Sequence, residues 1–151
     1  MAEQLRDARH DELESLTELC LRSKAMWGYD DAFMAACRAE LTLQPAEVQS
    51  THLQLAVAEE AAVGLVQIAI VAKEAHLLKL FVEPRRVRTG IGRLLLDWAI
   101  ERARSLGARQ MTIEADPDAA PFYRRMGANL AGLAPSASIP GRMLPRLILN
   151  L

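Results

Sequence analysis

Cysteine is scarce in this 151-residue chain, which contains only Cys20 and Cys37. Two cysteines cannot build the disulfide framework of a small secreted domain, and they cannot supply the four ligands of a structural zinc site. Both lie in stretches where apolar residues recur at helical spacing. We therefore expect two small buried side chains and no metal site.

The chain also lacks a basic excess and a long apolar run. Lysine and arginine together number 18 against 19 acidic residues, and the resulting net charge of −1 argues against a dedicated nucleic-acid binder. The opening residues, MAEQLRDARHDELESL, contain no apolar core of the kind found in signal peptides, and no stretch approaches the length of a membrane span. We expect a cytoplasmic protein with neither a membrane nor a nucleic-acid partner.

The spacing of apolar residues predicts one α/β domain covering residues 1–151. Periods near 3.6 residues, typical of helices, and of 2 residues, typical of strands, give the order β-α-α-β-β-β-α-β-α-β-β and hence one mixed layer. Asp11 and either Asp30 or Asp31 are the expected starts of the first two helices, and Gly107 is the expected stop of the third. We expect strands at residues 3–9, 52–60, 61–72, 75–82, 108–115, 128–134 and 146–151, and helices at residues 10–26, 32–41, 91–106 and 118–126.

A glycine turn separates the strand that ends at Val82 from the helix that begins near Ile91, in the sequence VEPRRVRTGIGRLLL. A dinucleotide-binding turn needs a third glycine where this chain has Leu95, and a Walker A loop needs a lysine, which this turn lacks. Gly90 and Gly92 leave bare backbone N–H groups at a helix start, where the helix dipole favours an anion such as phosphate. The alternative is a flexible turn with solvated arginines, and spacing alone leaves both open. Arginines that could add contacts to a phosphate are Arg85, Arg86, Arg88 and Arg93.

Two segments resemble the GNAT superfamily of N-acetyltransferases. Residues 77–103, LLKLFVEPRRVRTGIGRLLLDWAIERA, resemble its acetyl-CoA-binding segment, in which an apolar-x-Val-x-Pro strand end precedes Gln/Arg-x-x-Gly-x-Gly/Ala and a long helix. Residues 116–128, DPDAAPFYRRMGA, resemble its later Asn-x-x-Ala-x-x-Phe/Leu-Tyr-x-x-x-Gly segment. The resemblance implies an α/β (α+β) architecture, the GNAT acyl-CoA N-acyltransferase fold, with a mixed, mostly antiparallel sheet of about six to seven strands flanked by about four helices.

Two positions depart from the family's pattern. Val87 stands where the family usually has Gln or Arg, and Asp116 stands where it often has Asn. The family's contact at the first position is largely through a backbone N–H, with which Val is compatible. At the second position the sequence predicts that Asp116→Asn preserves folding and leaves or improves turnover.

The family binds acetyl-CoA between two diverging strands, which correspond here to residues 77–82 and 109–115. The resemblance implies that the pantetheine arm pairs with the backbone near Leu80–Val82 like an added strand, and that the pyrophosphate lies at the glycine turn. The residues that it assigns to the cosubstrate acetyl-CoA are Leu80, Phe81, Val82, Val87, Arg88, Thr89, Gly90, Ile91, Gly92, Arg93, Asp116 and Tyr123.

The resemblance also implies that an amine attacks the thioester directly in a ternary complex, without a covalent enzyme intermediate. Such a reaction needs a neutral amine, a donor for the developing oxyanion and a proton for the departing thiolate. Tyr123 matches the family's general-acid tyrosine, although its helical spacing also suits a core position, and the backbone of Val82 is the candidate oxyanion donor. Glu83 is our first choice as general base. Weaker candidates are Glu114, His76, His52 and a chain of water molecules.

The acceptor is expected to be a small amine or an amino group of a protein or peptide. Trp27 and Tyr29 beside Asp30 and Asp31 could enclose a cationic amine, or could instead anchor a loop and cap a helix. The loop at residues 136–145 could border the acceptor site or cover a homodimer contact. Three other functions stay open: a non-catalytic acetyl-CoA or CoA sensor on the same fold, a module for an anionic partner, and, least supported, an NAD-binding protein.

Overall fold

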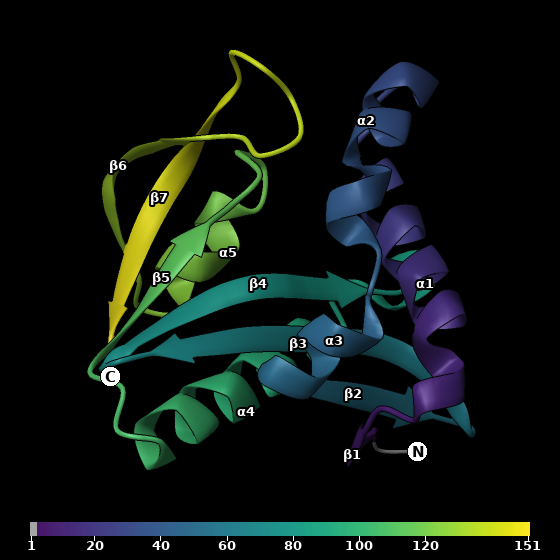
Figure 1. Cartoon of the computed structure of the whole chain (residues 1–151), viewed down its shortest axis with the longest axis horizontal. Helices are drawn as coiled ribbons and strands as arrows, with labels where there is room; N and C mark the ends of the chain where they lie inside the picture. Colours follow the sequence, from purple (N-terminus) through teal and green to yellow (C-terminus); the bar gives the residue numbers. More distant parts are fainter. Residues whose placement is uncertain (1–2) are drawn as a thin grey trace.

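The computed structural model describes residues 3–151, which form one seven-stranded sheet with helices on both faces (Figure 1). The strand order is β1-β2-β3-β4-β5-β7-β6, and every neighbouring pair is antiparallel except β4 and β5, which run parallel. The predicted mixed, mostly antiparallel sheet is therefore confirmed. The strands are β1 (Gln4–Asp7), β2 (His52–Ala58), β3 (Ala61–Val71), β4 (Glu74–Val82), β5 (Gln110–Glu114), β6 (Asn129–Pro135) and β7 (Met143–Asn150).

Five α-helices accompany the sheet within residues 3–151, one more than the sequence pattern predicts. The additional helix begins at Pro45, which the sequence pattern suggested only as the end of the preceding helical segment. The fixed φ of proline also suits the first position of a helix. Asp30 caps the second helix as expected, because its carboxylate accepts the N–H of Phe33 at 2.8 Å. The first helix starts after Glu12 instead of at Asp11, which lies in a short 3-10 turn. The helices are α1 (Leu13–Ala25), α2 (Asp31–Leu41), α3 (Pro45–Ser50), α4 (Ile91–Ser105) and α5 (Ala120–Arg125).

Two hydrophobic cores lie on opposite faces of the sheet, one beneath α4 and α5 and the other beneath α1, α2 and α3. Gly64 of β3 allows α4 to lie close to the sheet, because an added Cβ would come within 2.9 Å of Leu95 and 3.0 Å of Ile91. Gly64 pairs with Val82, the last residue of β4. The beginning of α4 is therefore held beside the end of β4.

Both cysteines belong to the core beneath α1 and α2, where Cys20 and Cys37 are free thiols and buried, as predicted. Burial raises the pKa of the Cys20 thiol to about 12, so this thiol is inert at neutral pH. Between residues 3 and 151 no three His, Cys, Asp or Glu side chains gather in a way that could hold a metal ion. In the same range no helix has the length and apolar character needed to cross a membrane.

β4 and β5 separate soon after their pairing begins. Pairing covers Glu74–Leu77 of β4 and Gln110–Ile113 of β5. The next residue, Leu78, is the extra residue of a β-bulge against β3, and bulges bend a strand and increase its twist. Beyond the bulge β4 stays paired with β3, while β5 stays paired with β7, so the two strands diverge (Figure 1). We call the space between their diverging ends the wedge.

Candidate active site

The edge of β4 that faces the wedge has no strand partner beyond Leu77 in the part of the chain that the structure describes. The N–H of Glu83 bonds to the carbonyl of Val63 on β3 at 2.8 Å, so by alternation the N–H of Val82 points away from β3 and towards the wedge. There it donates to Ser23 Oγ of α1 at 3.3 Å, which is a long hydrogen bond. An extended ligand could pair with this edge as an additional strand.

The N-terminus of α4 lies at the same end of the sheet and has no side-chain cap. Its N-cap residue is Gly90, with φ of 91°, whereas α2 is capped by Asp30. The first N–H groups of α4 therefore carry the partial positive charge of the helix terminus without a protein acceptor from the cap residue. A Cβ on Gly90 would meet no atom within 4 Å, so its outer side is open to a ligand. These features fit an anion such as a pyrophosphate.

Gly92 differs from the sequence-based interpretation. A Cβ at this position would contact the Phe122 ring at 3.5 Å and Val82 at 3.9 Å, so it would face α5 and the end of β4. Clearing space for a pyrophosphate therefore suits the geometry of Gly90 but not that of Gly92. The distances to Phe122 and Val82 are ordinary van der Waals distances, so a Cβ at Gly92 would pack against α5 without a clash.

The predicted acetyl-CoA residues fall into three places: the end of β4, the glycine turn with the first turn of α4, and the connection from β5 through α5. The first two places are adjacent because Gly64 holds α4 against the sheet. Ile91 is 1% exposed as a whole residue, so its side chain belongs to the core and does not face a ligand. Exposed members of the set are Arg88, Thr89, Gly90 and Arg93.

Tyr123 of α5 has a buried ring, 7% exposed, that packs edge-on against Phe122 with 5.2 Å between centroids. Its hydroxyl makes no hydrogen bond to any residue from 3 to 151. Within that range only one side-chain oxygen or nitrogen is both inaccessible to solvent and without a partner, and it belongs to Gln54. The Tyr123 hydroxyl is therefore accessible to solvent. Burial and the negative charge of Asp116 raise the pKa of Tyr123 above its ordinary value. The phenol therefore stays protonated and keeps its O–H available to a ligand.

Glu83, the predicted base, is occupied by Arg22 of α1, which donates to its two carboxylate oxygens at 3.0 and 2.7 Å. The Arg22 hydrogen bonds lower the pKa of Glu83 below its usual range. A carboxylate in this state is a weak base, so the geometry disfavours the role predicted for it. His76 pairs with Thr112 in the closed part of the β4–β5 ladder, and His52 lies at a different edge of the sheet.

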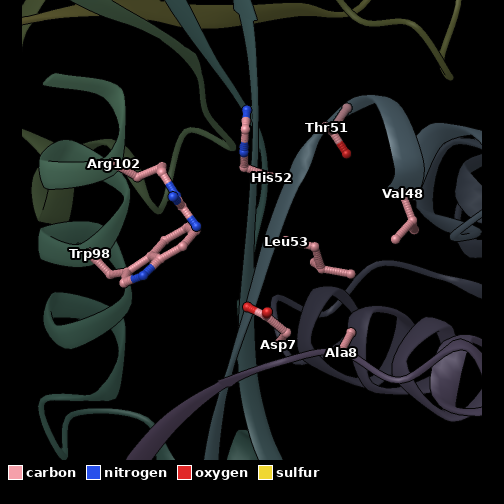
Figure 2. A pocket seen from close by; sticks show the side chains of 8 residues that line it. All are labelled: Asp7, Ala8, Val48, Thr51, His52, Leu53, Trp98 and Arg102. Atoms are coloured by element: carbon pink, nitrogen blue, oxygen red, sulfur yellow. The ribbon is translucent and has the colours of Figure 1, made fainter. Parts of the chain in front are cut away.

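The pocket at that other edge has a volume of about 240 Å³ (Figure 2). Trp98 and Arg102 of α4 face His52 of β2 across it, and the Arg102 guanidinium lies 5.3 Å from the centre of the Trp98 ring. Burial and the positive charge of Arg102 lower the pKa of His52. Apart from His52, the pocket contains none of the predicted cofactor or catalytic residues.

Asp116 lies at the centre of a polar cluster that connects the two sides of the wedge. Lys24 Nζ of α1 donates to its two carboxylate oxygens at 3.1 and 3.2 Å, and Tyr29 Oη and Arg142 Nη2 donate to Oδ1 at 3.3 Å each. Arg142 also donates to the Tyr29 hydroxyl at 2.7 Å. The Tyr29 ring stacks on Phe33 with centroids 3.9 Å apart. These five residues are called the Asp116 cluster.

The Asp116 cluster changes the interpretation of the aromatic segment before α2. The Lys24 ammonium lies 5.5 Å from the centre of the Tyr29 ring and 5.9 Å from that of Phe33, and the Arg142 guanidinium lies 5.1 and 4.9 Å from them. The protein's own cations therefore lie against Tyr29, one of the two rings that could have enclosed a cationic amine. Asp30 caps α2 as described above. The predicted loop at residues 136–145 is shorter in the structure, because residues 143–145 already belong to β7. It does reach this region through Arg142.

Asp116→Asn is now expected to destabilise the protein. The Lys24 and Arg142 side chains are only 12% and 19% exposed, so without the carboxylate two partly desolvated cations lose their counter-charge. We expect a loss of about 1–3 kcal/mol in the free energy of unfolding, measured by urea denaturation. The control is Asp97→Asn, which removes an exposed pair with Arg93 and should cost less than about 0.5 kcal/mol. Equal small losses would show that the cluster contributes nothing to stability.

Comparison with known proteins gives one family and many structures of the same fold. The sequence model for the acetyltransferase (GNAT) domain matches residues 16–129. PaiA N-acetyltransferase from Thermoplasma acidophilum, solved with coenzyme A, is 18% identical, with a TM-score of 0.81 over 100% of both chains. A GCN5-related N-acetyltransferase from Rhodopseudomonas palustris is 18% identical, with a TM-score of 0.82 over 100% of this chain and 97% of the other. Among curated proteins, no sequence matches this one.

The ribosomal-protein-S18-alanine N-acetyltransferase from Escherichia coli is a third example of the same architecture. It is 18% identical, with a TM-score of 0.72 over 98% of this chain and 93% of the other. At such identities the solved structures establish the fold, and the fold predicted from the two sequence segments is confirmed.

Proposed function

Because this chain belongs to the GNAT acetyltransferase family, we propose that it transfers the acetyl group of acetyl-CoA directly to an amine acceptor in a ternary complex. The observation that carries this proposal is the divergence of β4 from β5 with the uncapped N-terminus of α4 beside it. A free strand edge suits the pantetheine arm, and an uncapped helix start suits the pyrophosphate. The Thermoplasma acidophilum protein of the same fold was solved in complex with coenzyme A.

Two parts of the chain would hold acetyl-CoA, the end of β4 and the glycine turn with its neighbouring arginines. The backbone at Leu80–Val82 pairs with the pantetheine arm, and the N–H groups of the turn from Val87 to Arg93 bind the pyrophosphate. Exposed arginines beside the turn add charge-assisted contacts. Asp116 contributes through its cluster and not as a ligand of the cosubstrate, because Lys24, Tyr29 and Arg142 already occupy its carboxylate.

The residues of the wedge would supply the oxyanion donor and the acid. Bound acetyl-CoA brings an activated acetyl group, and the N–H of Val82 exchanges its long bond to Ser23 for the acetyl carbonyl oxygen, where negative charge develops. Tyr123 donates its proton to the departing thiolate. Since Arg22 occupies Glu83, we assign removal of the amine proton to water in contact with solvent.

Calorimetric titration with acetyl-CoA, dephospho-CoA and NAD tests the cofactor half of the proposal. We expect acetyl-CoA to bind with a dissociation constant of about 1–100 μM, and NAD not to bind. Release of free CoA thiol in the presence of amines tests the catalytic half. Absence of acetyl-CoA binding would overturn the proposal, and tight binding without turnover of any amine would favour the non-catalytic sensor on the same fold.

A further inference from the structure

We propose that Lys24 and Arg142 bind a carboxylate of the acceptor, so that the acceptor is an amine that also carries a carboxylate, as free amino acids and peptides do. This inference rests on the proposed function, because it concerns the acceptor side of the same site. It names the class of the acceptor, which the family leaves open.

The Asp116 cluster carries an excess positive charge. It contains two cations, Lys24 and Arg142, and the single carboxylate of Asp116. The side chains of the three residues are 12%, 19% and 10% exposed, so water compensates the excess only in part. The neighbouring pair of Arg22 and Glu83 is neutral in sum. One additional carboxylate would neutralise the cluster, whereas a phosphate dianion would leave an excess of negative charge.

Arg142 has donors to spare. Only its Nη2 atom is engaged, with Tyr29 and Asp116, among residues 3–151. Its Nε and Nη1 groups reach solvent, because the one sealed and unpartnered side-chain oxygen or nitrogen in the described range is on Gln54. The rings of Tyr29 and Phe33, at 5.1 and 4.9 Å from the guanidinium carbon, hold the guanidinium plane in place. A fixed planar fork of N–H donors matches a carboxylate.

The cluster also lies close enough to the proposed reaction centre to bind a second group of a small acceptor while its amine reacts. Lys24 directly follows Ser23, whose hydroxyl meets the N–H of Val82 at the wedge. Asp116 accepts the N–H groups of Ala119 and Ala120 through its carbonyl, at the beginning of the helix that carries Tyr123. The cluster therefore adjoins both the residue that contacts the proposed oxyanion donor and the start of the helix that carries the proposed acid. By contrast, an acceptor with a second positive charge would be repelled by two cations.

Matched pairs of amines test this inference. The probes are free amino acids and dipeptides, each compared with its own C-terminal amide at equal concentrations of unprotonated amine, and thiol release gives kcat and KM. We expect the acids to be preferred over the amides by about tenfold or more in kcat/KM, the size of one charge-assisted hydrogen bond. The preference should lie in KM, since the carboxylate takes no part in the chemical step.

Arg142→Gln should raise KM for the acids by about tenfold and leave KM for the amides within about twofold. Arg38→Gln is the control, because Arg38 is an exposed cation of α2 that pairs with Glu18 outside the cluster. Arg142→Lys, which keeps the charge but loses the fork, should recover part of the preference. Melting temperatures and acetyl-CoA titrations of each variant separate loss of the fold from loss of acceptor binding.

Each outcome bears on the inference. Equal or better turnover of the amides, turnover of no member of any pair, or an equal KM increase for acids and amides in Arg142→Gln would overturn it. None of these results would affect acetyl-CoA binding by the unmodified protein. Failure of the cofactor half of the proposed function is therefore distinguishable, because it appears in the calorimetric titration alone.

Discussion

Gly90→Glu is expected to weaken acetyl-CoA binding by about 100-fold or more. The carboxylate would sit at the N-cap of α4, where it would accept the first N–H groups of the helix and place negative charge in the proposed pyrophosphate site. A Cβ on Gly90 meets no atom within 4 Å, so the new side chain disturbs ligand binding without a clash in the protein. Calorimetric titration with acetyl-CoA measures the change.

Gly107→Glu is the matched control because it makes the same substitution at the other end of α4. Gly107 has φ of 88° and, like Gly90, no atom within 4 Å of an added Cβ. Both variants therefore carry the same backbone strain of about 1–2 kcal/mol. Because a carboxylate is favoured at a helix N-terminus and disfavoured at a C-terminus, the melting temperature of Gly107→Glu should fall at least as far as that of Gly90→Glu. Only Gly90→Glu should lose affinity, while Gly107→Glu should stay within about threefold of the unmodified protein. Retained affinity in Gly90→Glu, or an equal loss in both, would show that the glycine turn does not bind acetyl-CoA.

Features of the fold that depend on local periodicity could be predicted from the sequence. All seven strands and four of the five helices follow from apolar spacing. Asp30 begins α2 by capping its N–H groups, and Gly107 ends α4 because its positive φ suits glycine. The short helix after Pro45 could not be predicted in this way. Its six residues span less than two turns, too few for a helical period to show.

The partners of charged side chains could not be predicted, because tertiary contacts determine them. Lys24 lies 92 residues from Asp116, and Tyr29 lies 113 residues from Arg142. No local pattern connects such positions, so Lys24 and Arg142 carried no functional signal in the sequence. Glu83 illustrates the same limit: its place after the cofactor strand suggested a base, whereas its contact with Arg22, 61 residues away, makes it a poor one.

Tyr123→Phe is expected to reduce kcat by about 100-fold or more, with acetyl-CoA affinity within about twofold of the unmodified protein. The substitution removes only the hydroxyl, and the ring keeps its edge-on packing with Phe122. Because that hydroxyl has no hydrogen-bond partner among residues 3–151, its loss should not lower the melting temperature. The two roles therefore predict different results for the substitution. If Tyr123 is only a core residue, kcat stays unchanged, and if it is the acid, kcat falls while the melting temperature does not.

The pH dependence of kcat separates the acid role further. Burial and the charge of Asp116 raise the pKa of Tyr123 above its ordinary value of 10.0, so the protonated form persists to higher pH than for a free phenol. The unmodified enzyme should therefore show no loss of kcat with rising pH up to 10.0, while deprotonation of the amine acceptor can only assist attack. If kcat instead fell below pH 10.0 in the unmodified enzyme and Tyr123→Phe showed the same fall, the acid would have to be another group. If kcat were the same with and without the hydroxyl at every pH, the role of Tyr123 would be structural only.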